Sequence, residues 1–482
     1  MIDMREEITS RTQIERCLSI RERLINEFVD IRDDVYSRWR ISPEPFFIDE
    51  PELSLIESLG RDLHSFYKAS NKLYYESMHG RQPGWIAMYL NQGKPRSLIE
   101  YACMNRIKGL LPGIIRPDII LTEGGMVATE LDSVPGGMGI TGNLNKVYSD
   151  HGFTVVGEKD GMSQGFLNML KSVTQMPDPM IAIVVSEESR DYRPEMEWLA
   201  GAIKDLGGRA LAVRPGELIF TEEGLYIDDG ECRTRIDVVY RFFELFDLKN
   251  IPKIELIMYS AKKKEVAVTP PFKPFLEEKM LYALFHHPML EGYWRRELGE
   301  DVCSKLRNIF PRTWILDPAE MPAYGIIPGL KVGRRAVSRW TELAEATQNE
   351  RAFVIKPSGF SDLAWGSRGV VAGDDVSKEE WGEAIDRALK GFDKTPYVLQ
   401  EYYKGRHVEV AYLDEDTLSP SPHRGEGVFS IKKMTGRVRL CPYYFVEGED
   451  VRLRGIMATI CPLDKKLIHG MRDAVITVTG IR

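Results

Sequence analysis

The chain has 482 residues, more than one hydrophobic core usually supports, so we expect two or three packed domains. Its 43% hydrophobic and 28% charged residues are typical of a globular protein, and its net charge of −8 argues against a nucleic-acid partner. No apolar run approaches the roughly 20 residues of a membrane span, so we expect no membrane partner either.

The amino terminus and the cysteines both favour a cytoplasmic location. The first seven residues are charged and helix-like, and they lack the apolar core of a secretory signal. The six cysteines are widely scattered and form no CxxC pair. This pattern is typical of reduced thiols and argues against a zinc site or a disulfide framework.

Residues 1–110 predict a helical region. Apolar residues recur at helical spacing between Ile14 and Phe28 and again between Leu53 and Tyr75. A Ser-Pro-Glu-Pro stretch at 42–45 separates the two runs. Nothing in this region points to chemistry.

The stretch 116–137 predicts a β-hairpin with an acidic face. Two short strands, 118–121 and 126–131, are joined by a glycine turn. Because strand side chains alternate between faces, Glu130 and Asp132 point the same way, and Asp118 can pair onto that face. Three carboxylates together repel one another unless a cation lies among them. Their hard oxygens suit Mg²⁺ or Mn²⁺.

The hairpin leads directly into Pro135-Gly136-Gly137, where a substrate or an oxyanion could approach the backbone closely. The alternative interpretation is a solvated acidic face followed by an ordinary glycine turn. Thr129, Leu131 and Val134 do not look like an exposed edge, which favours the functional interpretation.

Residues 173–268 predict a small open α/β domain, because buried-type strands alternate with a helix and a hairpin. The expected strands are 179–185, 209–213 and 236–241, with a helix at about 194–206 and a hairpin at 218–227. Such a domain binds nucleotides or other substrates, so the fold alone does not decide its function.

Two later segments carry lysines in distinctive settings. A helix is expected over 275–286 and contains Lys279. The strand beginning at Phe353 carries Lys356 and runs into a Gly/Ser loop with Arg368. A strand and glycine loop of this kind can cover a phosphate, but neither a Walker A loop nor a Rossmann fingerprint is present. An ordinary flexible hairpin is the alternative.

The chain ends with further strands. A strand over 397–403 contains Gln400-Glu401-Tyr402-Tyr403, which could bind and stack on a purine. The tail from Val428 to Val478 reads as alternating strands, with basic residues that we assign mostly to the surface.

Taken together, five motifs resemble those of the ATP-grasp superfamily, the ligases typified by D-alanine–D-alanine ligase and glutathione synthetase. They are Arg116-x-Asp118, Glu130-x-Asp132 followed by Pro135-Gly136, Lys279, Lys356 with the 358–369 loop, and the 400–403 hinge. The family usually has the last three first. The order here resembles a circular permutation, as in eukaryotic glutathione synthetase, glutathionylspermidine synthetase and the bacterial circularly permuted ATP-grasp proteins. The resemblance spans about 111–460.

Two positions depart from the family pattern. Asp132 replaces an asparagine, which keeps an oxygen ligand but adds a charge. His407 stands near the place where the family often has a ribose-binding glutamate, which leaves the ribose contact open.

The resemblance implies an α+β fold in which two lobes enclose ATP, with an inserted α/β domain and an N-terminal helical region. The implied divisions are a helical region at 1–110, a metal-binding hairpin lobe at 111–172, the α/β domain at 173–268, a lobe with the lysines, glycine loop and hinge at 269–427, and returning strands at 428–482.

The resemblance also implies an activity, an ATP- and Mg²⁺-dependent carboxylate–amine ligase that forms an amide through an acyl phosphate. Asp118, Glu130 and Asp132 would hold metal. Arg116 would hold the γ-phosphate, and N–H groups near Gly136 and Gly137 would stabilise the oxyanion. ATP would contact Lys279, Lys356, Ser358, Gly359, Gly366, Ser367, Arg368, Gly369, Gln400, Glu401 and Tyr403.

Two alternatives remain open. One is a phosphotransferase of the same fold that stops at a phosphorylated product. The other is a nucleotide-binding protein without turnover, suggested by Asp132 and His407. The substrates would be small carboxylates and amines, such as amino acids, peptides or polyamines, and the sequence does not identify them.

Overall fold

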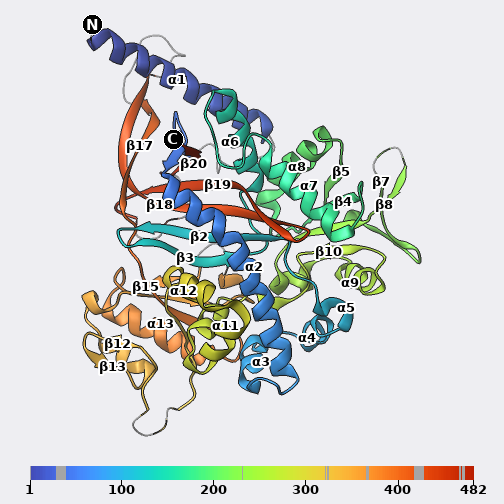
Figure 1. The fold of residues 1–482 in the computed structure, drawn as a ribbon, viewed down its shortest axis with the longest axis vertical. Helices are drawn as coiled ribbons and strands as arrows, with labels where there is room; N and C mark the ends of the chain where they lie inside the picture. The colour runs from blue at the N-terminus through green and yellow to red at the C-terminus, as the bar shows by residue number, and fades with distance from the viewer. Residues whose placement is uncertain are drawn as a thin grey trace.

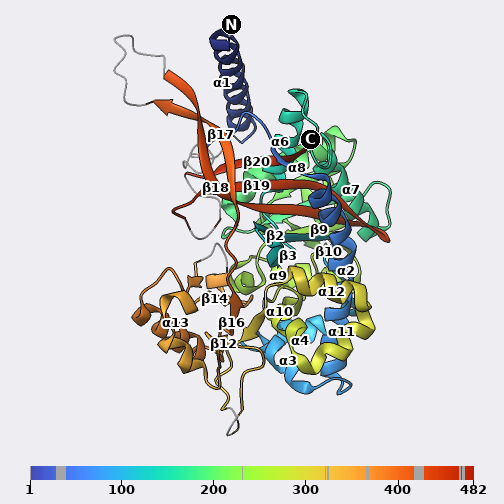
Figure 2. The same ribbon diagram turned by 60° about the vertical axis from the view of Figure 1, so that its left-hand side comes forward.

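The computed structural model describes residues 2–28, 39–228, 230, 232–320, 322, 325–364, 368–416, 428–465, 468 and 473–482. Helices and several separate β-sheets alternate along the chain, which confirms the mixed α+β class (Figure 1). Figure 2 shows the sheet of β18, β19 and β2 in the upper part of the molecule and the elements β14, β16 and α13 below it.

The largest sheet joins the two ends of the chain. Its strand order is β1 (Phe46–Ile48), β20 (Val475–Ile481), β19 (Asp450–Pro462), β18 (Val428–Glu447), β2 (Ile114–Thr122) and β3 (Gly125–Asp132), with β17 (His407–Asp416) also paired to β18. All neighbours are antiparallel except β1 and β20. The β2–β3 hairpin therefore lies beside strands that come more than three hundred residues later.

Helices cover both faces of this sheet. The face contacted by α2 (Glu50–Met78) buries Ile115 and Tyr444, whereas their neighbours Ile114 and Tyr443 pack on the opposite face with α6 (Met138–Asp150) and α7 (Gly161–Thr174). Adjacent strand residues point to opposite faces, so the sheet contributes to two cores. Helix α1 (Ile2–Glu27) packs on the second face as well.

A parallel four-stranded sheet forms the α/β unit predicted over 173–268. Its order is β10 (Ala267–Thr269), β9 (Val238–Phe242), β4 (Met180–Val185) and β5 (Arg209–Val213), accompanied by α8 (Arg193–Asp205) and α9 (Ile254–Lys263). Strand β4 is buried along its whole length, as expected for a strand covered on both faces. The predicted hairpin is present as β6 (Ile219–Thr221) and β7 (Gly224–Asp228), joined by β8 (Arg233–Arg235).

An antiparallel sheet carries the second lysine strand. Its order is β11 (Thr313–Ile315), β16 (Tyr397–Glu401), β14 (Phe353–Pro357) and β15 (Val371–Ala372), and α13 (Lys378–Lys390) packs against it. A small ribbon, β12 (Lys331–Val332) with β13 (Arg335–Ala336), lies nearby. The remaining helices are α3 (Gly84–Asn91), α4 (Arg96–Ala102), α5 (Asn105–Lys108), α10 (Met280–His286), α11 (Glu291–Leu298) and α12 (Glu300–Ile309).

Two expected boundaries and one expected region differ from the structure. The helix expected from residue 275 begins only at Met280, because a 3₁₀ turn at 274–276 precedes it and the Met280 N–H donates to Ser358 Oγ at 3.1 Å. Strand β17 belongs to the large sheet and not to the lysine-bearing sheet, so the boundary expected at 427 falls earlier. The N-terminal region also contributes β1 to the large sheet.

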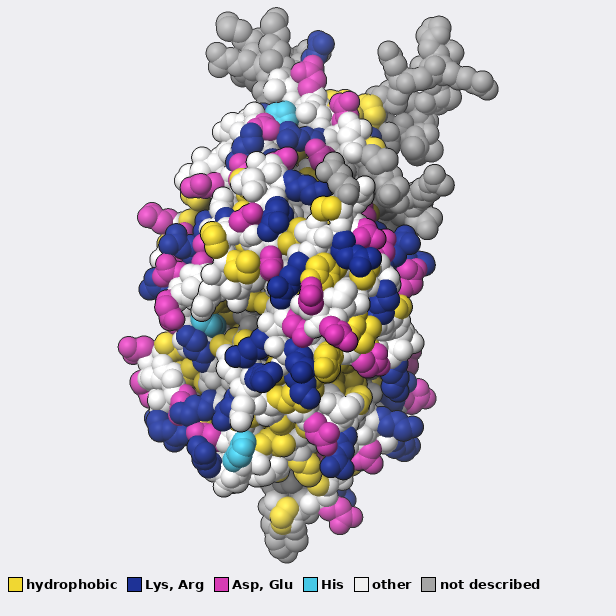
Figure 3. Space-filling view, turned by 90° about the vertical axis from the view of Figure 1, so that its right-hand side faces the viewer, with side chains coloured by type: hydrophobic (Ala, Val, Ile, Leu, Met, Phe, Trp, Pro, Cys, Tyr) yellow, Lys and Arg dark blue, Asp and Glu magenta, His cyan; other side chains and the backbone are white. Residues whose placement is uncertain are grey.

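The surface in Figure 3 shows basic and acidic side chains interspersed over the visible face. Within the described ranges, every helix is too short or too polar to cross a membrane.

Candidate functional site

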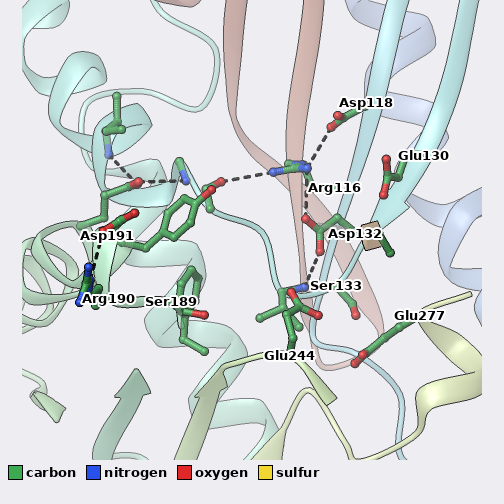
Figure 4. A pocket seen from close by; sticks show the side chains of 18 of the residues that line it. Arg116, Asp118, Glu130, Asp132, Ser133, Ser189, Arg190, Asp191, Glu244 and Glu277 are labelled. Atoms are coloured by element: carbon green, nitrogen blue, oxygen red, sulfur yellow. Dashed lines mark hydrogen bonds and ion pairs between the residues drawn. The ribbon is translucent and has the colours of Figure 1, made fainter. Parts of the chain in front are cut away.

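A cavity of about 950 Å³ lies where the β2–β3 hairpin, the α/β unit and the segment before α10 meet (Figure 4). Acidic side chains outnumber basic ones along its lining. The lining includes Arg116, Asp118, Glu130, Asp132, Gly136, Gly137, Lys279 and Gly359 from the residues singled out in the sequence.

The hairpin register brings the predicted charged residues together. Arg116 pairs with Asp132 across the two strands, and Asp118 pairs with Glu130, with a bulge after Asp118. Arg116 Nη2 lies 3.1 Å from both Asp118 Oδ1 and Asp132 Oδ2. Arg439, from β18, adds a contact of 2.9 Å to Asp118 Oδ2. The two aspartates are therefore paired with arginines, a role that the sequence analysis did not predict for Arg116 or Arg439.

These contacts have opposite effects on the two aspartates. Burial acts to raise the pKa of Asp118, but Arg116 and Arg439 outweigh it and hold that pKa below its usual range. Burial raises the pKa of Asp132, and the guanidinium of Arg116 and the N–H of Val134 offset this only in part. Asp132 is thus the aspartate whose charge a further cation would stabilise more.

Both predicted lysines reach the hairpin from distant parts of the chain. Lys279 Nζ lies 2.7 Å from Glu130 Oε1. Lys356 Nζ donates to the carbonyl oxygen of Thr129 at 3.2 Å and to Gln400 Oε1 at 2.8 Å. Burial lowers the pKa of Lys356 to about 8, whereas the Glu130 carboxylate outweighs burial and raises the pKa of Lys279. Segments more than two hundred residues apart therefore meet at one hairpin.

The glycine loop begins at a buried polar cluster. Ser358 donates to Glu278, whose other oxygen pairs with the fully buried Lys94. A Cβ on Gly359 would lie 2.4 Å from the carbonyl oxygen of Glu277, so this close approach requires glycine. The sequence did not identify Lys94, which comes from the N-terminal helical region.

The rest of the loop is only partly described. Gly366 and Ser367 lie outside the described residues. Arg368 Nη1 lies 3.5 Å from Glu188 Oε1 in the α/β unit, and Gly369 donates its N–H to the carbonyl of Leu363. These two residues are not among those that line the cavity.

The expected hinge lies behind Lys356. Gln400 is buried, accepts from Lys356 and donates to Thr313 Oγ1 at 3.2 Å. Tyr403 donates to Glu401 Oε2 at 3.0 Å and is 39% exposed. None of these three hinge residues, Gln400, Glu401 or Tyr403, lines the cavity, and neither do Lys356 and Ser358.

The two glycines expected to bind an oxyanion have other partners. Gly137 donates its N–H to Glu195 Oε1 at 3.3 Å, and Gly139 and Ile140 donate to the other oxygen of this carboxylate. Gly136 presents its carbonyl oxygen, which accepts from Tyr443 at 2.7 Å. In this structure the Gly137 N–H is thus occupied by a protein carboxylate, which caps the first turn of α6.

Residues that the sequence did not single out complete the acidic part of the cavity. Glu244 follows β9, and burial together with Glu277 and Asp132 raises its pKa to about 8. Glu277, from the segment before α10, pairs with Arg241, which is a fully buried residue of β9. The only usable signal was position: Glu244 comes just after the carboxyl end of a buried parallel strand, where open α/β sheets bind ligands.

Among the described residues, no group of three or more His, Cys, Asp or Glu side chains is arranged to hold a metal ion unaided. The donor chemistry of Glu130 and Asp132 nevertheless fits Mg²⁺ shared with a phosphate, because both are hard oxygen ligands and their side chains are 34% and 30% exposed. Asp118 fits the role of ligand less well, since its oxygens contact Arg116, Arg439 and Cys441.

No family model and no curated protein matches this sequence. Among the solved structures, a glutathione synthetase-like effector from Globodera pallida, in its apo form, aligns over 97% of this chain and 97% of its own, with a TM-score of 0.57 and 11% identity. A putative γ-glutamylcysteine synthetase from Methylobacillus flagellatus KT covers 86% of each chain with a TM-score of 0.42 and 11% identity, too weak to support an argument. The first alignment shows that the chain has a glutathione synthetase-like fold, which confirms the resemblance at the level of the fold.

Proposed function

We propose that this protein is an ATP- and Mg²⁺-dependent ligase that joins a carboxylate to an amine, built on a circularly permuted ATP-grasp fold. The observation that carries the proposal is the meeting of two distant lysine segments with one acidic hairpin. Lys279 pairs with Glu130 at 2.7 Å, and Lys356 donates to the Thr129 carbonyl at 3.2 Å. Such an arrangement suits a bound triphosphate, whose charge needs both lysines and metal-binding carboxylates.

The chain order supports the permutation. The hairpin lobe comes first, at 111–172, and its β2 pairs with β18 from the final strands, at 428–482. The α/β domain at 173–268 and the lysine-bearing lobe, whose three-stranded part β11, β16 and β14 spans 313–401, lie between them in the chain. Joining the natural ends and opening the chain before the hairpin would give this order.

The nucleotide would lie between the hairpin and the lysine-bearing sheet. Lys356 and Lys279 would neutralise the α- and β-phosphates, with the loop from Ser358 to Gly369 covering them. Glu401 and Tyr403, at the end of β16, would contact adenine, while Gln400 positions Lys356 by accepting its hydrogen bond.

Glu130 and Asp132 would hold Mg²⁺, which when bound would neutralise charge on the β- and γ-phosphates. Lys279 would then exchange its contact with Glu130 for one with phosphate. Asp118 would orient Arg116 and Arg439 through the contacts described above, so that both guanidiniums face the transferred phosphoryl group.

The reaction would proceed in two steps. A substrate carboxylate oxygen attacks the γ-phosphorus, ADP leaves, and Arg116 holds the transferred group as the acyl phosphate forms. The amine nitrogen then attacks the carbonyl carbon and phosphate leaves. Of the two protons that the ammonium group loses, one goes to phosphate and one to solvent.

The test is ADP release from Mg²⁺-ATP with pairs drawn from amino acids, short peptides and polyamines. We expect release only when a carboxylate and an amine are both present. Glu130→Gln, which keeps the side-chain shape but removes a metal-binding charge, should lower kcat by about 100-fold. Glu123→Gln, on the exposed turn of the same hairpin, is the matched control and should leave kcat unchanged.

Other outcomes would overturn the proposal in different ways. ADP release with one substrate and a phosphorylated product would indicate a phosphotransferase. Mg²⁺-dependent ATP binding without ADP release from any pair would indicate a nucleotide-binding protein without turnover. Equal activity of Glu130→Gln and the wild type would show that the Glu130 carboxylate of the hairpin takes no part in the reaction.

A further inference from the structure

The acidic side chains of the cavity differ in their partners. On the hairpin side, Glu130 pairs with Lys279, and Asp118 and Asp132 share Arg116. Glu244, on the side of the α/β unit, makes no side-chain hydrogen bond or ion pair with any residue that the structure describes, although it lines the same cavity. Glu244 therefore faces the cavity without an ion-pair partner among the described residues, although Arg241 and Lys279 act on it from a distance.

A second, independent feature lies beside it. Ser133 is 3% exposed and lines the cavity, and its Oγ has no hydrogen-bond partner within the described part of the chain. In Figure 4 the labels of Ser133, Glu244 and Glu277 all lie below Asp132, and the charges of Asp132 and Glu277 act on Glu244. A buried hydroxyl without a partner is costly, and a ligand that hydrogen-bonds to it removes that cost.

We propose that Ser133, Glu244 and Glu277 form the subsite that binds the ammonium group of the amine substrate. The inference rests on the proposed ligase function and adds the charge and the position of the second substrate. An ammonium group carries three N–H donors and one positive charge. One donor would bind the Glu244 carboxylate, one the Ser133 hydroxyl oxygen, and one the Glu277 carboxylate, which also pairs with Arg241.

Other ligand chemistries fit these residues less well. A substrate carboxylate would be repelled by Glu244, Glu277 and Asp132, whose charges already oppose one another. A metal ion fits less well because Glu277 already pairs with Arg241, and the Ser133 hydroxyl is a neutral ligand. A neutral alcohol would satisfy Ser133 but leave the charge of Glu244 without a partner.

The subsite also has a suitable location. Ser133 follows Asp132 directly, and Asp132 contacts Arg116, the residue assigned to the transferred phosphoryl group. An amine held at Ser133 thus lies on the cavity wall next to the place where the acyl phosphate would form, as the second step of the proposed reaction requires.

The test uses n-butylammonium as a probe in equilibrium dialysis with the full-length protein and no nucleotide. n-Butanol and butyrate serve as neutral and anionic controls of the same length. Wild-type protein should bind butylammonium more tightly than either control. Glu244→Gln should weaken this binding by about tenfold, because a charge-assisted hydrogen bond is lost. Ser133→Ala should weaken it by about threefold.

Glu187→Gln is the matched control, since Glu187 lines the cavity on the side of Arg190 and is mostly exposed. It should bind butylammonium as the wild type does. Butylammonium binding no tighter than butanol, or binding that neither Glu244→Gln nor Ser133→Ala changes, would overturn the inference. Because the assay contains no ATP, Glu244-dependent binding without ADP release would overturn only the ligase function. ADP release with Glu244-independent binding would overturn only the subsite.

Discussion

Acidic side chains lie on both walls of the cavity, but they are paired on one wall and less completely paired on the other. The hairpin wall holds Asp118, Glu130 and Asp132 in contact with basic side chains. On the opposite wall, Glu277 has Arg241 whereas Glu244 has no ion-pair partner among the described residues. A paired wall is ordered before any ligand arrives, while an unpaired carboxylate is held at the expense of stability. The difference predicts opposite effects of removing charge from the two walls.

The largest expected effect is on the paired wall. Arg116→Met would leave Asp132 without its guanidinium partner and Asp118 with Arg439 alone. Loss of one partner from a buried ion pair typically costs about 3–5 kcal/mol. We expect the free energy of unfolding in urea to fall by that amount.

The matched control is Arg190→Met, at the exposed rim of the same cavity, which should change stability by less than about 1 kcal/mol. Addition of Asp132→Asn to Arg116→Met should recover part of the loss. If Arg116→Met unfolds at the same urea concentration as the wild type, the ion pairs of Arg116 with Asp118 and Asp132 do not stabilise the fold.

The next effect concerns the support behind this wall. Lys94 and Glu278 form an ion pair with almost no exposure, and Glu278 also accepts from Ser358 at the start of the glycine loop. Lys94→Met should lower the free energy of unfolding by about 3 kcal/mol. In the proposed ligase reaction it should also raise the KM for ATP more than it changes kcat, because the start of the glycine loop would lose its contact with a paired Glu278.

Lys94→Met combined with Glu278→Gln is the control for charge, because it removes the unpaired carboxylate and keeps an acceptor for Ser358. It should be more stable than Lys94→Met alone. A double variant as unstable as the single one would mean that Lys94 acts through other contacts, such as that of its ammonium group with the Phe360 ring, and not through Glu278.

A smaller effect is expected where the two walls meet. A Cβ on Gly136 would lie 2.2 Å from the Tyr192 ring of the α/β unit, so Gly136→Ala must move one wall relative to the other. Overpacking of this kind costs about 1–3 kcal/mol. We expect Gly136→Ala to lower the thermal midpoint and Tyr192→Leu to recover much of the loss. Gly216→Ala, which meets no atom within 4 Å, should leave the midpoint unchanged.

The hairpin wall was largely predictable from the sequence because its information is local. Alternating side chains and a glycine turn define the β2–β3 strands, and the spacing of Asp118, Glu130 and Asp132 places them on one face. The contact of Arg439 with Asp118 joins residues 321 positions apart and depends on the pairing of β18 with β2. No local pattern predicts that pairing.

The opposite wall and the buried Lys94–Glu278 ion pair were not predicted, and the reason is again that they depend on distant contacts. Glu244 and Ser133 are single residues of common types. They stand out only because their side chains have no hydrogen-bond or ion-pair partner among the described residues. Lys94 lies three residues after the end of α3, and the sequence around it gives no sign that it pairs with Glu278. The late start of α10 likewise depends on Ser358, which lies 78 residues later and caps its first N–H.

The smallest expected effect, and the one of opposite sign, is on the unpaired wall. Glu244→Gln replaces a carboxyl that has no ion-pair partner among the described residues and that ionises less readily in the fold than in the unfolded chain, so at neutral pH we expect a gain in the free energy of unfolding of about 1 kcal/mol. The pKa of Glu244 is raised from its usual value near 4.5 to about 8, so the folded protein binds the proton more tightly than the unfolded chain does. The Glu244 carboxyl therefore destabilises the fold progressively as pH rises from about 4.5 to about 8. The gain from Glu244→Gln should be absent below that window, grow through it and level off above it, as urea unfolding of both proteins across the range would measure. If Glu244→Gln is instead less stable than the wild type at every pH, the Glu244 carboxyl makes a stabilising contact in the folded protein. The contrast between the two walls would then no longer hold.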